Sequence, residues 1–143
     1  YWMNISDYSI PFLAVIEHTN FIDKSHYGGN HIVYLTNYLG KDSPMYGMDK
    51  EELFSTYLPH LKKLNAEFDR SWITDYYYHR EEAAQPIVTT NYTNKIPPYR
   101  TPIGRLYLAN TTQIYPEDRG TNYSVRLGQH ISRLVVDDQL TTR

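Results

Sequence analysis

Two apolar segments on either side of a glycine-rich turn constrain the fold of this chain most strongly. Residues 12–17, "FLAVIE", and residues 31–39, "HIVYLTNYL", are rich in apolar and β-branched side chains, which favours strands. Between them, residues 27–30 read "YGGN", and glycine and asparagine readily adopt the positive φ angles of a hairpin turn. The pattern predicts an antiparallel pair of strands, with residues 1–6 as a further edge strand.

A helix is predicted to begin after Asp49, because Asp49 and Glu52 have the spacing of a capping box. Apolar side chains then recur at helical spacing as far as Leu64. Pro59 interrupts this pattern, since its ring clashes with the carbonyl four residues earlier in a helix. We expect a kink at this proline, or two short helices in place of one.

The second half of the sequence predicts more strands and a last helix. Residues 72–81 and 103–110 have the composition of strands. Three prolines within residues 95–102 exclude a helix or a central strand there and mark a boundary. A final helix is expected from about Thr121 to Val136, and its apolar face comprises Leu127, Ile131, Leu134 and Val135. The order of elements predicts an α+β fold with a largely antiparallel sheet, one covering helix and a C-terminal helix.

Composition excludes several classes of function. The chain has 143 residues and a net charge of -2 without a basic stripe, so we expect no nucleic-acid partner. It has no cysteine and its histidines are scattered, so we expect no metal site. No apolar run is long enough to span a membrane. The absence of thiols fits a reducing compartment, and we expect a cytoplasmic protein. No sequence fingerprint names a catalytic residue.

Two polar clusters are candidate sites. Residues 17–20, Glu-His-Thr-Asn, follow an apolar strand, and they suit either acid–base chemistry or a structural hydrogen-bond cluster. In a strand, residues 76–80 would place Tyr76, Tyr78 and Arg80 on one face. That face would either hold a planar ligand or pack across strands with its hydroxyls in water.

The stretch "YPEDRGTNYSVRLG", residues 115–128, is the strongest candidate for a binding site. The first N–H groups of a helix lack internal partners and lie at the positive end of its dipole. Gly120 precedes the helix and permits the close approach of a phosphate or of the electron-rich edge of a flavin. Ordinary capping by Thr121 or Asn122 accounts for the same residues.

Residues 105–135, "RLYLANTTQIYPEDRGTNYSVRLGQHISRLV", resemble the C-terminal end of the flavin-dependent amine oxidase and protoporphyrinogen oxidase-like superfamily. Residues 11–21, "PFLAVIEHTNF", and 80–88, "REEAAQPIV", resemble strands of that family's substrate domain. The resemblance implies a substrate-binding lobe, residues 1–104, and a returning strand and helix of the FAD-binding lobe, residues 105–143. The family's glycine-rich FAD fingerprint is not in this sequence, so we expect a fragment that binds no FAD by itself.

The resemblance also implies which residues lie near the flavin. Gly120, Thr121 and Asn122 fall at the helix start that faces the flavin ring, and Arg119 precedes them. Asn110 falls where the family has an acidic residue that contacts the ribityl chain of FAD. The residue before it is alanine, where the family has glycine.

The implied activity is that of an FAD-dependent oxidoreductase, which takes a hydride from an amine or an activated C–H substrate. His79, Arg80 and Gln85 are the candidate residues for binding the small-molecule substrate. A cofactor-free module that binds a small molecule or a sugar through its tyrosines is the alternative. The apolar face of the last helix predicts one of three outcomes: the helix folds back on the chain's own sheet, pairs with a second copy in a homodimer, or frays. Folding back and pairing are the two favoured outcomes.

Overall fold

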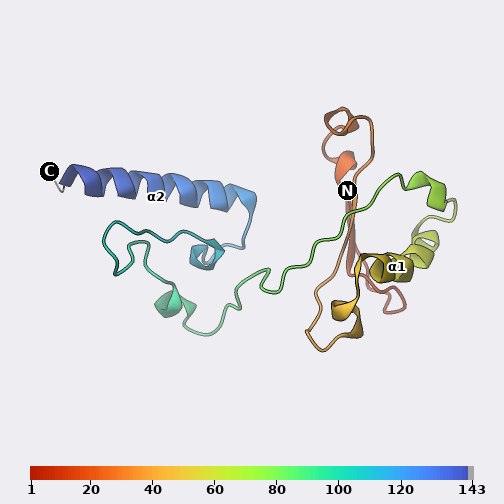
Figure 1. Cartoon of the computed structure of the whole chain (residues 1–143), viewed down its shortest axis with the longest axis horizontal. Helices are drawn as coiled ribbons and strands as arrows, with labels where there is room; N and C mark the ends of the chain where they lie inside the picture. The colour runs from red at the N-terminus through yellow and green to blue at the C-terminus, as the bar shows by residue number, and fades with distance from the viewer. Residues whose placement is uncertain (142–143) are drawn as a thin grey trace. The chain divides into compact units, whose positions relative to one another are not determined.

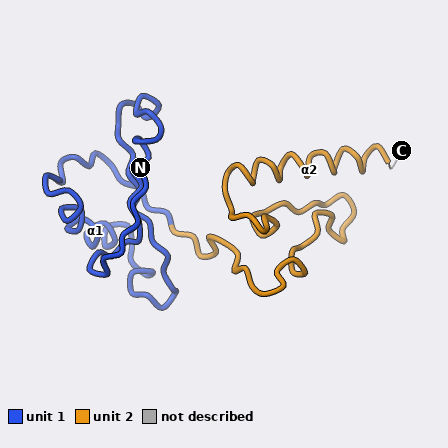
Figure 2. Tube along the Cα trace, turned by 180° about the vertical axis from the view of Figure 1, so that it is seen from behind, with its two compact units in different colours: residues 1–79 blue, residues 80–143 orange. Residues whose placement is uncertain are grey.

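The computed structural model describes residues 1–141 and divides the chain into two compact units, which begin at residues 1 and 80 (Figure 1). Figure 2 colours the two units separately. The fold is α+β, with a three-stranded antiparallel sheet and two α-helices, the second of them C-terminal, as predicted. Residues 80–104 lie in the same unit as the last helix. The lobes implied by the resemblance, which divide after residue 104, stay a prediction.

The sheet lies in the first unit and has the strand order β1-β2-β3. The strands are β1 (Trp2–Asn4), β2 (Ala14–Glu17) and β3 (Val33–Thr36), and each is shorter than the segment that predicts it. The register aligns Met3 with Val15 and Val15 with Leu35. Gly28 and Gly29 have φ angles of 64° and 85°, which confirms the turn between β2 and β3.

Helix α1 (Lys50–Leu64) begins with the predicted capping box. The Asp49 carboxylate accepts hydrogen bonds of 2.9 Å from the backbone N–H groups of Glu51 and Glu52, and the Glu52 carboxylate accepts one of 3.0 Å from the Asp49 N–H. The helix continues through Pro59, so the prediction of two short helices is wrong. Pro59 has no N–H group to donate to the Ser55 carbonyl four residues earlier. Both residues are exposed, so water can reach this carbonyl.

The core of the first unit lies where α1 packs on the sheet. Phe12, Val15 and Tyr57 are buried together, and the rings of Phe12 and Tyr57 meet edge to face at 5.2 Å. The partly buried residues around them are Ile5, Ile10, Leu35, Met45, Leu53, Leu61 and Leu64. Burial raises the pKa of the Tyr57 hydroxyl, so this side chain stays neutral.

Residues 72–81 do not form the predicted strand. A 3-10 helix covers Arg70–Trp72, and the following residues have no regular secondary structure. The alternation of side chains is nevertheless present, because Tyr77 is 79% exposed while its neighbours on either side are half-buried. The Tyr76 ring stacks on Phe54 of α1 with the ring centroids 3.9 Å apart, and the Tyr76 hydroxyl donates to Glu51. Side chains of this segment thus pack on α1, but its backbone has no neighbouring strand with which to pair.

The predicted strand at residues 103–110 is also wrong. Only one isolated bridge, between Arg100 and Tyr107, forms there. The chain reverses direction between these two residues, and Arg105 adopts a φ of 65° inside the turn. The nearby prolines lack the N–H group that a longer ladder needs, so pairing ends after a few hydrogen bonds.

Helix α2 (Thr121–Thr141) starts where the sequence predicts and continues past the expected end at Val136. Its four predicted apolar residues, Leu127, Ile131, Leu134 and Val135, are all half-buried in the second unit. Asp138 accepts hydrogen bonds from the Arg100 guanidinium at 2.6 and 2.7 Å and from the Tyr107 hydroxyl at 2.8 Å. The helix therefore folds back on its own unit, which does not contain the sheet on which it was expected to pack. A homodimer through α2 stays a prediction.

Candidate functional site

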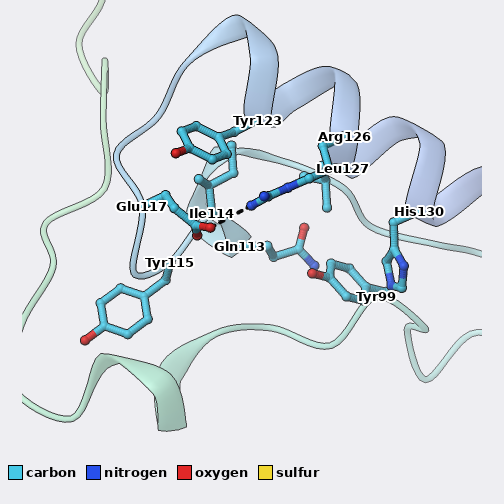
Figure 3. A pocket seen from close by; sticks show the side chains of 9 residues that line it. All are labelled: Tyr99, Gln113, Ile114, Tyr115, Glu117, Tyr123, Arg126, Leu127 and His130. Carbon is cyan, nitrogen blue, oxygen red and sulfur yellow. Dashed lines mark hydrogen bonds and ion pairs between the residues drawn. The ribbon is translucent and has the colours of Figure 1, made fainter.

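A pocket of about 300 Å³ lies beside the N-terminal half of α2, within the second unit (Figure 3). One side is formed by α2 residues spaced one helical turn apart, which share a face of the helix. The other side is formed by the segment that precedes the helix and by one tyrosine farther upstream. The lining residues are Tyr99, Gln113, Ile114, Tyr115, Glu117, Tyr123, Arg126, Leu127 and His130.

A short 3-10 helix, Thr111–Gln113, fixes one wall of the pocket. Asn110 caps it, since its side-chain oxygen accepts from the Thr112 N–H at 2.9 Å. The Gln113 side chain accepts from the Asn110 N–H at 2.9 Å and donates to the carbonyls of Pro97 and Leu108 at 3.1 Å each. Gln113 is only 6% exposed and makes three hydrogen bonds, so it holds the wall in place.

An ion pair crosses the pocket. Figure 3 shows the Arg126 guanidinium reaching from α2 toward the Glu117 carboxylate, and the two groups are 2.8 Å apart. The hydrogen bond from Arg126 lowers the pKa of Glu117, and the same bond raises the pKa of Arg126. The guanidinium also lies 4.8 Å from the centre of the Tyr123 ring, which is cation–π distance. At neutral pH the pair therefore presents one carboxylate and one guanidinium with no net charge.

Two further lining residues, Tyr99 and His130, contribute aromatic rings. The Tyr99 and His130 rings meet at an angle of 65° with their centroids 4.9 Å apart. Within residues 1–141, the hydroxyls of Tyr99 and Tyr123 have no hydrogen-bond partner. The pocket thus combines aromatic rings, hydroxyls without a partner and an ion pair that is partly exposed to solvent.

The residues expected near a flavin lie at or before the start of α2. Thr121 and Asn122 are exposed, and Gly120 and Arg119 are half-buried just before them. The φ angle of Gly120 is not in the left-handed region, and a Cβ placed on it would lie 2.7 Å from the Asn122 side-chain oxygen. The space next to Gly120 is therefore taken by a flexible side chain. Asn110, the other residue expected near the flavin, caps the short 3-10 helix that precedes α2 in the sequence.

The residues expected to bind substrate are not brought into the pocket. His79 is the last residue of the first unit, while Arg80 and Gln85 belong to the second. All three are exposed, in a stretch that has turns but no helix or strand. Their role stays a prediction.

The polar cluster at residues 17–20 is a set of structural hydrogen bonds. The Asn20 amide donates to the Glu17 carboxylate, and the Thr19 hydroxyl bonds the His31 ring at 3.1 Å. The His18 ring meets the Tyr27 hydroxyl at 2.5 Å. Each of these polar side chains is thus engaged with a neighbour in the loop between β2 and β3, which favours the structural interpretation of this cluster.

Sequence reasoning missed the pocket, although part of its signal is present. Tyr123, Arg126, Leu127 and His130 follow the spacing of one helix face, but only Leu127 counts in an apolar pattern. Within residues 1–141, no group of three or more histidine, aspartate or glutamate side chains is placed to hold a metal ion. Among the described helices, none combines the length and apolar character that crossing a bilayer requires.

Comparison with known proteins adds no relative. No family model matches the chain, and neither the curated proteins nor the solved structures contain a match.

Proposed function

We propose that this chain is part of a flavin-dependent oxidoreductase of the amine oxidase type. Residues 1–104 contribute to the substrate lobe, and residues 105–143 supply the returning segment and the last helix of the flavin lobe. The flavin carries the hydride chemistry in the whole protein. This chain shapes the space around the flavin ring and the small-molecule substrate.

The observation that carries the proposal is the amount of surface that the chain leaves uncovered. Its accessible surface area is 11266 Å². A globular chain of this mass exposes about 7,700 Å², and two separate globular units of half the mass expose about 9,300 Å² together. The excess of accessible surface remains when the two units are counted as independent domains. It supports the interpretation that further protein covers part of this surface. The resemblance of residues 105–135 names the kind of protein.

Helix α2 contributes to this uncovered surface. Val125, Val136 and Leu140 are exposed by half or more, away from the half-buried apolar face of the helix. Exposed apolar side chains of this size are usual on surfaces that other protein covers. In the resemblance, α2 is the helix that packs on the flavin domain, so its uncovered side chains are where that domain is expected.

The test is the visible absorption of the full-length protein that contains this sequence. We expect bound flavin at close to one per folded protein, and no saturable flavin binding by the 143-residue chain alone at micromolar concentration. Gly120→Val places a branched side chain where the Asn122 amide now lies, so it should lower the flavin occupancy. Gly104→Val is the matched control, because a Cβ there meets nothing within 4 Å.

A folded full-length protein without flavin would refute the proposal. Tight flavin binding by the chain alone would refute the expectation that it is a fragment of the flavin site. Equal occupancy in the two glycine variants would leave Gly120 as an ordinary residue before a helix.

The second candidate function is a cofactor-free module that binds a small molecule or a sugar. The observation that favours it is the pocket beside α2, whose lining belongs entirely to the second unit. Saturable binding of a small molecule by the 143-residue chain, with no flavin present, would support this candidate.

A further inference from the structure

We infer that the pocket beside α2 binds a neutral polyhydroxylated ring, of which a pyranose is the simplest example. The inference rests on the second candidate function, that of a small-molecule module, and it does not depend on the flavin proposal. It is carried by the charges, the ring faces and the hydroxyl groups that line the pocket.

The ion pair decides the charge of the ligand. Glu117 and Arg126 are paired at 2.8 Å, and the pairing lowers the pKa of the Glu117 carboxyl, so both groups are charged at neutral pH. An anionic ligand would meet the Glu117 carboxylate, and a cationic ligand would meet the Arg126 guanidinium. Either ligand would be attracted to one member of the pair and repelled by the other, so the pair gives no net preference for a charged ligand. A neutral ligand leaves the pair intact.

The same two groups suit vicinal hydroxyls. A carboxylate accepts hydrogen bonds through two oxygens, and a guanidinium donates through several N–H groups arranged in a plane. A hydroxyl both donates and accepts, so neighbouring hydroxyls on one ring can donate to Glu117 and accept from Arg126 at once. Hydrogen bonds to charged groups are stronger than bonds between neutral groups, so this pair provides orientation as well as affinity.

The Tyr99 ring offers a face for the ligand ring itself, while one face of the Tyr123 ring contacts the Arg126 guanidinium. Tyr123 and Tyr99 line the pocket from α2 and from the upstream segment, and their hydroxyls have no partner within residues 1–141. An aromatic face packs on the C–H groups of a saturated ring, while the phenolic hydroxyl reaches the ring substituents. A purely apolar ligand would cover the ion pair without replacing its water, which is unfavourable. The lining thus favours a ring with both C–H faces and hydroxyls.

The size of the pocket fits one ring. Its volume of about 300 Å³ is at the lower end of the range for small-molecule sites. Few contacts are available to so small a ligand, and we expect dissociation constants in the millimolar range.

The experiment is an NMR titration of the 143-residue chain with single-ring probes. The neutral probes are the methyl glycosides of glucose, galactose and mannose, and the comparison probes are glucose 6-phosphate, glucosamine and indole. We expect at least one neutral glycoside to shift the amide signals of residues 113–130 in a saturable manner. Glu117→Gln should weaken that binding by about tenfold or more, since a charged acceptor is lost.

Two controls keep the result interpretable. Glu81→Gln makes the same change at an exposed residue outside the pocket lining and should leave the affinity unchanged. Tyr123→Phe keeps the ring, removes one hydroxyl and should weaken binding by a few-fold, which tests the site in a variant that preserves the packing of α2. Unchanged dispersion of the amide signals shows that each variant is folded.

Three results would overturn the inference. The first is that no neutral glycoside shifts these signals at tens of millimolar. The second is that glucose 6-phosphate or glucosamine binds more tightly than every neutral glycoside. The third is that the Glu117→Gln variant binds the glycoside as well as the original chain does. Saturable binding of indole and of no other probe would support a small-molecule module but refute a sugar as its ligand. None of these results bears on flavin in the full-length protein.

Discussion

The contacts inside the first unit differ in kind from the contacts inside the second. In the first unit, a helix packs on a sheet around the buried residues Phe12, Val15 and Tyr57. Among the described residues of the second unit, 80–141, the backbone forms a single isolated β-bridge and no sheet. Its long helix α2 has no fully buried residue, and it is anchored near its two ends by the ion pairs of Glu117 and Asp138.

The difference teaches what each unit needs in order to be stable. Apolar burial stabilises in proportion to the area removed from water, so the core of the first unit does not rely on charges that salt screens. Exposed ion pairs contribute little, and salt screens them. The second unit is therefore expected to be the weaker of the two until another protein surface or a ligand covers α2.

The largest expected effect is on the core of the first unit. Phe12→Ala removes a ring that is 2% exposed and should destabilise this unit by roughly 3–5 kcal/mol. Phe21→Ala is the matched control, since Phe21 is 67% exposed, and it should cost about 1 kcal/mol or less. Urea unfolding followed by NMR measures both. Equal losses for the two variants would contradict the contrast between the units.

A smaller effect of opposite sign is expected at Pro59. Proline in a helix interior is about 3 kcal/mol less favourable than alanine, and part of this is offset because proline also restricts the unfolded chain. Pro59→Ala should therefore stabilise the first unit by roughly 1–3 kcal/mol. Lys62→Ala, on the exposed surface of the same helix, should change the stability little. If Pro59→Ala destabilises the unit, the proline ring makes a contact that outweighs its missing hydrogen bond.

The anchor of α2 is expected to show a weaker and more local effect. Asp138→Asn removes the charge that accepts from Arg100 and Tyr107, so amide exchange should become faster in the last turns of α2. Asp137→Asn is the matched control, because Asp137 is an exposed neighbour on the same helix. Exchange in the first unit should be unchanged in both variants. Equal exchange rates in the two variants would show that Asp138 does not anchor the end of α2.

Acid should act on the same anchor. The hydrogen bonds from Arg100 and Tyr107 lower the pKa of Asp138 from 3.8 to about 2. Because the folded pKa is the lower one, the contribution of Asp138 is complete above pH 3.8 and is lost as the pH falls toward 2. The carboxyl ¹³C shift of Asp138 should titrate with a midpoint near 2. A midpoint near 3.8 would show that the anchor does not form in solution.

Local sequence signals predict the elements of this fold where the signal is complete within a few residues. The capping box at Asp49, the glycine turn before β3 and the start of α2 at Thr121 are all of this kind. The strands expected at 72–81 and 103–110 fail, because a strand needs a partner and sequence composition does not supply one. The alternation around Tyr77 survives because it depends on side chains packing on α1.

The candidate site is harder to predict than the fold. Its ion pair joins Glu117 in a loop to Arg126 on a helix, and Tyr99 comes from a segment more than twenty residues away from α2 in sequence. Helical spacing places Tyr123, Arg126 and His130 on one face, but it does not say what lies opposite them. The predicted residues at the helix start depend on a resemblance, and the flavin occupancy of the Gly120→Val variant tests them.

The most direct test of the contrast between the units is amide hydrogen exchange of the 143-residue chain, resolved by residue at neutral pH. We expect the slowest exchange in β2 and in the part of α1 around Tyr57, and much faster exchange along α2, because the contacts of α2 are polar or half-exposed. Protection of α2 equal to or greater than that of α1 would contradict the account. It would show that the second unit is complete without any further protein surface.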